Sequence, residues 1–169
     1  MKHLLITLSA AATLALSGCG FTPMHATQGG QATFSNVALE VGDGKTEQDR
    51  AAGFAFAQHM RARIGDSAAP AYTLSVTPRI GRTGLGLTAQ DRATRFDRNF
   101  TASWSLSDTA TGTLIARGRS QDTTTFTGDL DPYRLASNDD QSMQRVTRVV
   151  ADEVLAEVAL AIQDARSKP

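Results

Sequence analysis

The sequence predicts an α+β fold in two layers: a mixed four-stranded sheet with two helices on one face, in the order β-α-β-β-β-α. Two segments repeat apolar residues at helical spacing, and four segments alternate apolar with polar residues, as half-buried strands do. Each helical segment has a single apolar stripe, so both helices are expected to cover the apolar face of the same sheet. The second sheet face is polar and must meet water or a partner.

The first strand is expected at residues 33–41, and a Gly-Asp-Gly turn follows it. The first helix is expected at residues 46–64. Thr46 is its N-cap, and Asp49 three residues later completes a variant of the capping box. Gly65 is placed to end the helix in a left-handed conformation. The expected apolar stripe of this helix consists of Gly53, Phe54, Ala57, Met60 and Ile64.

The second strand is expected at residues 72–77, where Pro78 ends the strand or marks a sheet edge. Residues 81–91 form a glycine-rich connection in this interpretation. The third strand, at residues 94–107, is long, and only Arg98 breaks its alternation of apolar and polar side chains. Its apolar face is expected to hold Phe96, Phe100, Ala102, Trp104 and Leu106.

The fourth strand is expected at residues 113–127 and pairs with the third as a hairpin. Residues 120–127 are almost all polar, which favours a strand end that projects beyond the sheet. Residues 128–137 are expected to form a loop, and residues 138–164 a long helix capped by Ser137. The helix between the first two strands predicts that they are parallel, and the remaining strands should be antiparallel. The stripe of the long helix consists of Met143, Val146, Val150, Val154, Val158 and Ile162.

The N-terminus has the features of an export signal that is cleaved. A short basic start precedes an uncharged run at residues 4–16, which is shorter than the roughly 20 residues of a membrane-spanning helix. The sequence Leu16-Ser17-Gly18-Cys19 resembles the bacterial lipobox. Residues 1–18 are therefore interpreted as a lipoprotein signal peptide, residues 19–31 as a lipidated tether and residues 32–166 as a single domain.

Cys19 is the only cysteine of the chain, so it has no partner for an internal disulfide. The lipobox resemblance implies that Cys19 carries a covalent diacylglycerol and an N-acyl chain such as palmitate, and no other cofactor is expected. Two or more acyl chains hold a protein firmly in a bilayer. Because Gly20 is not the aspartate that favours inner-membrane retention, we expect the chain on the outer membrane, facing the periplasm.

Composition and motifs argue against several classes of function. The 17 basic and 17 acidic residues balance, which gives no general affinity for nucleic acid. His3, His25 and His59 lack metal-ligand spacing, so no metal site is expected. Residues 84–89 match a loose dinucleotide-binding pattern, but a strand rather than a helix is expected after them. No GxSxG motif is present, and lipidation removes the one cysteine nucleophile, so we expect no enzyme.

Arginines form the one candidate functional constellation. Basic residues of the precursor are mostly arginine, whose forked donors suit phosphate and carboxylate groups. An alternative is that these are ordinary surface arginines, paired with nearby aspartates or reflecting a GC-rich genome. The candidates for contact with an anionic lipid headgroup, lipopolysaccharide in particular, are Arg82, Arg92, Arg95 and Arg145.

Three stretches carry a resemblance to a known family. They are residues 19–24, with the order Cys-Gly-Phe-Thr-Pro-Met; residues 93–112, from the third strand into the hairpin turn; and residues 133–154 in the last helix. Together they make the chain similar to LptE, the lipopolysaccharide-assembly lipoprotein family, in an alphaproteobacterial form.

The resemblance implies a role without a reaction. LptE proteins plug the LptD outer-membrane barrel, assist its assembly and take part in inserting lipopolysaccharide into the outer leaflet. LptD and lipopolysaccharide are therefore the implied partners. One alternative is an auxiliary lipoprotein of a phospholipid-transporting ABC system, and another is a membrane-anchored hydrolase.

Overall fold

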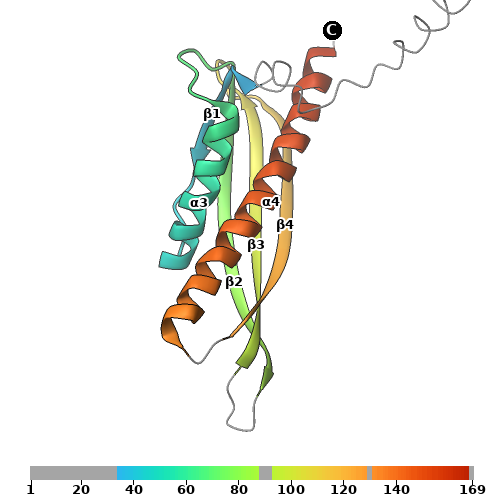
Figure 1. Cartoon of the computed structure of the whole chain (residues 1–169). Helices are drawn as coiled ribbons and strands as arrows, with labels where there is room; N and C mark the ends of the chain where they lie inside the picture. Colours follow the sequence, from blue (N-terminus) through green and yellow to red (C-terminus); the bar gives the residue numbers. More distant parts are fainter. Residues whose placement is uncertain (1–33, 88–92, 129–130, 168–169) are drawn as a thin grey trace, which may run out of the picture. The chain divides into compact units, whose positions relative to one another are not determined.

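The computed structural model describes residues 34–87, 93–128 and 131–167. They belong to one compact unit, Gln31–Pro169, which is described here by itself. Residues 1–31, interpreted above as signal peptide and lipidated tether with Cys19, lie outside the described residues. Figure 1 shows the elements, which in chain order are β1 (Val37–Val41), α3 (Glu47–Ile64), β2 (Tyr72–Leu87), β3 (Ala93–Asp108), β4 (Leu114–Thr127) and α4 (Pro132–Ser167).

The four strands form one mixed sheet in the order β1-β2-β3-β4. β1 is parallel to β2, and the pairs β2–β3 and β3–β4 are antiparallel. Both helices lie on the same face of the sheet, with α4 running obliquely across it beside α3 (Figure 1). The predicted fold class, element order and strand directions are confirmed.

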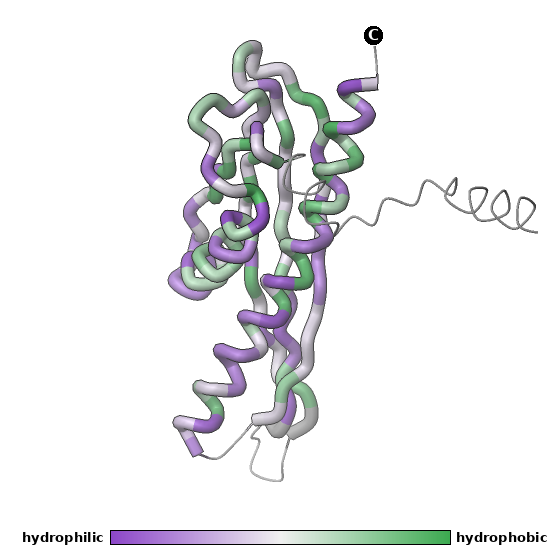
Figure 2. The backbone as a smooth tube through the Cα atoms, turned by 45° about the horizontal axis from the view of Figure 1, so that its top comes forward, coloured by the Kyte–Doolittle hydropathy of each residue, from purple (hydrophilic) through white to green (hydrophobic). Residues whose placement is uncertain are grey.

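The core lies between the sheet and the two helices. Phe56 of α3 and Phe100 of β3 are fully buried, with ring centroids 5.5 Å apart. Sequence periodicity assigned Phe54 to this core, and that assignment is wrong, because Phe54 is 63% exposed. In Figure 2, hydrophilic and hydrophobic stretches alternate along α4, as expected for a helix that buries one stripe. The buried residues of α4 are Ser142, Val146, Thr147, Val150, Ala151, Val154, Leu155, Val158, Ala159 and Ile162.

Asp49 joins the start of α3 to the sheet. The predicted capping box is present, since Thr46 accepts from the Asp49 backbone N–H and Asp49 accepts from that of Thr46. The other carboxylate oxygen of Asp49 accepts the backbone N–H of Ile80 at 2.8 Å. Burial raises the pKa of Asp49, but the hydrogen bonds from Ile80 and Thr46 and the charge of Arg79 together hold this pKa below its ordinary value.

β2 does not end at Pro78, as the sequence suggested, but continues to Leu87 and pairs with β3 over most of its length. The Ile80 N–H points away from β3 toward Asp49. Pro78 has the same parity along the strand, so its missing N–H falls on the outer side, beyond the last β1 pair at Val41. The expected glycine-rich connection at residues 81–91 is therefore mostly strand.

β4 and α4 also differ from expectation. Residues 120–127 do not project beyond the sheet, because they pair with β3 as far as Thr127 opposite Arg95. The long helix begins at Pro132 rather than at residue 138. The Asp131 carboxylate accepts the Tyr133 N–H at 2.9 Å, as an N-cap does, and Pro132 occupies the first helical position.

Candidate functional site

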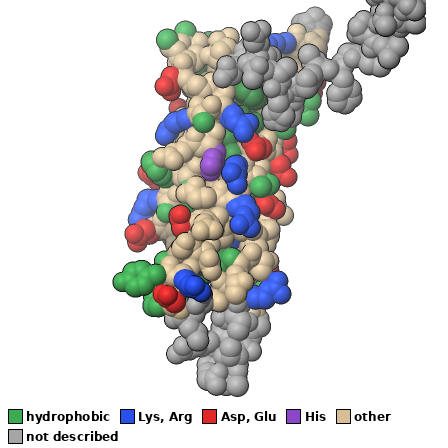
Figure 3. Space-filling model, viewed as in Figure 1, with side chains coloured by type: hydrophobic (Ala, Val, Ile, Leu, Met, Phe, Trp, Pro, Cys, Tyr) green, Lys and Arg blue, Asp and Glu red, His purple; other side chains and the backbone are tan. Residues whose placement is uncertain are grey.

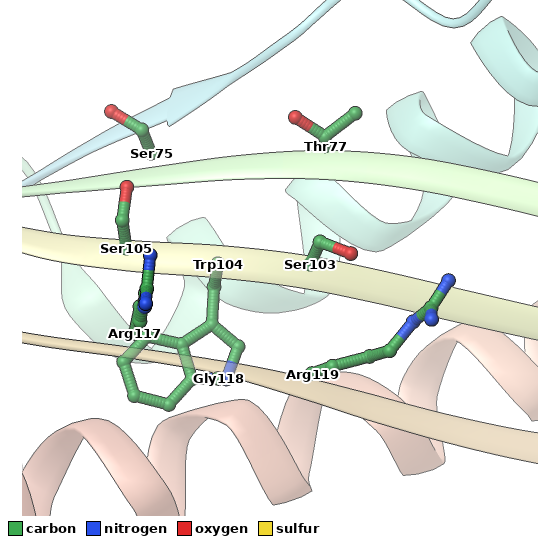
Figure 4. A pocket seen from close by; sticks show the side chains of 8 residues that line it. All are labelled: Ser75, Thr77, Ser103, Trp104, Ser105, Arg117, Gly118 and Arg119. Atoms are coloured by element: carbon green, nitrogen blue, oxygen red, sulfur yellow. The ribbon is translucent and has the colours of Figure 1, made fainter.

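The candidate site is the sheet face opposite the helices, which we call the open face. Side chains with alternate numbers on β2, β3 and β4 point there, and cross-strand pairing places Ser75 beside Ser105 and Thr77 beside Ser103. No described helix packs on this face. A shallow hollow of about 570 Å³ lies over it (Figure 4). The hollow is lined by Ser75, Thr77, Ser103, Trp104, Ser105, Arg117, Gly118 and Arg119.

Arg117 and Arg119 provide the charge of this hollow. They lie on β4 opposite Ser105 and Ser103, and both are exposed. The ion pairs found among the described residues join Arg63 to Asp152 and both Arg82 and Arg98 to Asp139, so they leave this arginine pair without an acidic partner. Two like charges about 7 Å apart on one strand face favour an external anion.

The floor of the hollow is formed by Trp104, whose indole crosses β4 at Gly118 (Figure 4). A Cβ atom at Gly118 would lie 2.6 Å from Cζ2 of the indole, so a glycine is required for this packing. The indole N–H donates to Glu157 of α4 at 2.9 Å, and the Ser120 hydroxyl donates to the same carboxylate oxygen at 3.0 Å. The open face is thereby fixed to the helix layer beneath it.

The arginines predicted from sequence are not brought together. Arg82 lies on the helix-covered face, where its guanidinium is 5.2 Å from the Phe96 ring centroid and 3.5 Å from Asp139. Arg95 is exposed on the opposite face, and Arg92 lies outside the described residues. Arg145 borders a separate small hollow of about 170 Å³ between the end of β4 and the start of α4. A single binding site built from these four residues is therefore not what the described chain shows.

Arg98, the residue that broke the apolar alternation of β3, is buried and has structural partners. Its Nε donates to the Ser142 hydroxyl at 2.9 Å, and it pairs with the Asp139 carboxylate. Its guanidinium also lies 5.6 Å from the Phe126 ring centroid. Phe126 in turn stacks on Phe96. This cluster fastens the first half of α4 to the far end of the sheet.

The helix side has a different distribution of charge. Figure 3 shows basic and acidic side chains interspersed over it. On the open face, by contrast, the acidic residues Asp97 and Glu40 accept hydrogen bonds from Thr125 and Ser75. The central arginine pair has only hydroxyl neighbours across the strands. On the strand positions of the open face, basic residues thus outnumber acidic ones.

The sequence held one signal for the open-face arginines. Arg117 and Arg119 share strand parity on β4, opposite the apolar-facing positions such as Ala116. Register with β3 was needed to place them beside Ser103 and Ser105, and periodicity within one strand does not give register. Among the described residues, no group of three or more metal-ligating side chains occurs, and no helix has the length and apolar character needed to cross a membrane.

Comparison with known proteins gives likenesses of structure. No family model matches the chain, and no curated protein matches it. A lipoprotein from Caulobacter crescentus is similar over 83% of this chain and 98% of its own, with a TM-score of 0.61 and 19% identity. Rare lipoprotein B from Shewanella oneidensis is similar over 77% of this chain and 98% of its own, with a TM-score of 0.56 and 12% identity.

Lipoprotein B from Nitrosomonas europaea gives a third likeness, over 73% of this chain and 81% of its own, with a TM-score of 0.53 and 11% identity. All three chains are under a fifth identical to this one, so the likeness concerns the fold. The chain has the same α+β fold as these bacterial lipoproteins.

Proposed function

We propose that this chain is an LptE-like lipoprotein of the outer membrane, which plugs the LptD barrel, assists its assembly and takes part in inserting lipopolysaccharide into the outer leaflet. The observation that carries the proposal is a helix-covered sheet whose other face is polar, arginine-bearing and uncovered by any described helix. The fold shared with solved lipoproteins and the lipobox at Cys19 support it.

The physical argument concerns where a polar sheet face is stable. Covering hydroxyl and guanidinium groups with an apolar surface, without hydrogen bonds, raises the free energy of the protein. The lumen of a large outer-membrane barrel is polar and hydrated, so it can enclose such a face without this cost. The role needs binding and shape, and no catalytic group is assigned to it.

The anchor defines where the domain acts. In this proposal, acyl chains on Cys19 hold the N-terminus in the inner leaflet of the outer membrane, and residues 19–31 connect them to the domain. The domain then reaches a barrel in the same membrane without diffusing from the periplasm, which raises its effective concentration there.

Depletion of the protein from its native cells tests the proposal. We expect folded LptD to decline and surface lipopolysaccharide to fall, and expression of the wild-type chain should restore both. Normal amounts of folded barrel and a normal outer leaflet after depletion would contradict the proposal. A loss of phospholipid transport with an intact barrel would instead support the ABC-transporter alternative.

A further inference from the structure

The open face carries more positive than negative charge. Its strand positions include Arg79, Arg95, Arg117 and Arg119 against Glu40 and Asp97. Arg79 attracts Asp49 at the edge of the sheet, which leaves the other three arginines for the face itself. The two helices together are nearly balanced, because α4 has six acidic residues and four arginines and α3 has two acidic residues and three arginines. The excess of arginine on the open face therefore suits an acidic neighbour.

The arrangement around Arg117 and Arg119 suits carboxylates. Each guanidinium can form two parallel hydrogen bonds to one carboxylate, and their spacing along β4 allows both to be engaged from one partner surface. The hydroxyls of Ser103 and Ser105 opposite them are short, so side chains from a partner have room to enter the hollow. An apolar partner would leave these donors without acceptors.

We infer that the open face docks an acidic, polar protein surface, with Arg117 and Arg119 as its anchors. The inference rests on the proposed function in one respect: it takes the occupant to be the lumen wall of the barrel, presenting carboxylates to β4. Three observations carry it: the arginine pair lacks an acidic partner within the described chain, the hydroxyl rows leave a hollow beside it, and both helices lie on the other side of the sheet.

Trp104 provides a reporter beneath this site. It is the only tryptophan of the chain, it lines the hollow, and its indole lies against Gly118, the residue between the two arginines, on the helix-covered side of β4. Binding over Arg117 and Arg119 should therefore change its fluorescence. The same signal shows whether a variant keeps the native packing of the site.

The first experiment compares capture of the barrel by the lipidated, affinity-tagged chain in detergent extracts. Charge reversal with R117E and R119E should lower the captured barrel by about tenfold or more, because each contact becomes a repulsion. The conservative pair R117K and R119K should retain much of it. The control R50E and R148E changes the net charge equally at two exposed helix positions and should leave capture unchanged.

Capture of the barrel at the wild-type level by the reversed pair overturns the inference and leaves the proposed function standing. If charge reversal lowers stability, as Trp104 fluorescence and circular dichroism would show, the neutral pair R117Q and R119Q gives the same comparison. That pair should lose about threefold or more, and an unchanged capture again overturns the inference.

A second experiment separates the inference from the proposed function. The purified lipidated chain in micelles is titrated with poly-L-glutamate while Trp104 fluorescence is followed. We expect a response in the wild-type chain that disappears in the reversed pair and at about 0.5 M salt, where charges are strongly screened. If wild-type extracts contain no captured barrel, the proposed function fails. The titration then decides the inference alone, and the absence of a wild-type response overturns it.

Discussion

At the scale of single residues, Gly118 makes room for the side chain that joins the sheet to the helix layer. Its missing side chain lets the Trp104 indole lie against β4 and donate to Glu157. We expect Gly118→Ala to displace the indole and lower the free energy of unfolding by about 1–3 kcal/mol, a typical cost of overpacking. Urea unfolding followed by circular dichroism measures this change.

The matched control is Gly42→Ala. A Cβ atom there would lie 3.5 Å from the nearest atom, the Val76 carbonyl oxygen, which is an ordinary contact. Its free energy of unfolding should stay within about 0.5 kcal/mol of the wild-type value. Equal effects of the two substitutions would contradict the packing described for Trp104.

Asp49 is the second residue whose substitution has a specific predicted effect on the free energy of unfolding. Asp49→Ala removes the carboxylate half of the capping box and leaves the N–H groups of Thr46 and Ile80 without their acceptor, which should cost about 2 kcal/mol at neutral pH. Glu47→Ala, at an exposed position in the same first turn, should cost less than about 1 kcal/mol. Urea unfolding at neutral pH distinguishes the two.

The effect of Asp49→Ala should depend on pH. Because the folded-state pKa of Asp49 is below its ordinary value of 3.8, its stabilisation is present above that value and lost as the pH falls through the folded-state pKa. The difference between wild type and Asp49→Ala should therefore shrink in unfolding measurements below about pH 3.8. A difference that stays constant into this range would show that the charge of Asp49 contributes nothing.

At the scale of elements, the first half of α4 depends on the cluster of Arg98, Asp139 and Ser142. Asp139→Asn leaves the buried Arg98 guanidinium without its counter-charge, so we expect a loss of about 1–3 kcal/mol in the free energy of unfolding. Asp152→Asn breaks the half-exposed Arg63–Asp152 pair and should cost less than about 1 kcal/mol.

The double variant R98M/D139N tests the cause. Replacing a buried ion pair with apolar groups often restores stability, so the double variant should recover part of the loss seen in Asp139→Asn. Hydrogen exchange over residues 132–145 should report faster opening in Asp139→Asn alone. If Asp139→Asn were as stable as Asp152→Asn, the cluster would not hold this end of α4.

The elements also show what periodicity can and cannot predict. It identified the strands and helices from β1 to α4 and the Thr46–Asp49 capping box, because those signals are local. It left two alternatives for Pro78, a strand end or a sheet edge. Only the end of β1 at Val41 shows that Pro78 lies at an edge while β2 continues. It also placed the start of α4 at residue 138, with Ser137 as the N-cap. In the structure α4 starts at Pro132, and Asp131 and Pro132 form the stronger start signal.

The sequence predicted the candidate site less well than it predicted the fold. Arg82, Arg92 and Arg95 were grouped because they surround one loop in the sequence, and Arg145 was added from the last helix. The sheet separates Arg82 from Arg95 onto opposite faces. Arg117 and Arg119 form a candidate site because of their cross-strand neighbours and because the helices pack on the other side of the sheet. The strand register and the helix packing are both features of tertiary structure, which no single segment encodes.

At the scale of the whole molecule, the proposal requires a lipid anchor as well as a domain. We expect Cys19→Ser to abolish recovery of the chain in the outer-membrane fraction, because in this proposal acyl chains on Cys19 hold it there. Gly20→Asp keeps the lipidated cysteine and should move the chain toward the inner membrane. Fractionation followed by immunoblotting measures both, and outer-membrane recovery of Cys19→Ser at the wild-type level would rule out this anchor.

The central claim is that an anchored domain with a polar, arginine-bearing face is enclosed by the LptD barrel. Affinity purification of the lipidated chain from native membranes, with identification and quantification of its companion by mass spectrometry, tests it most directly. The account predicts the LptD barrel in about equimolar amount, as a closed one-to-one plug requires. Recovery of the chain alone, or with a phospholipid transporter in place of the barrel, would contradict it.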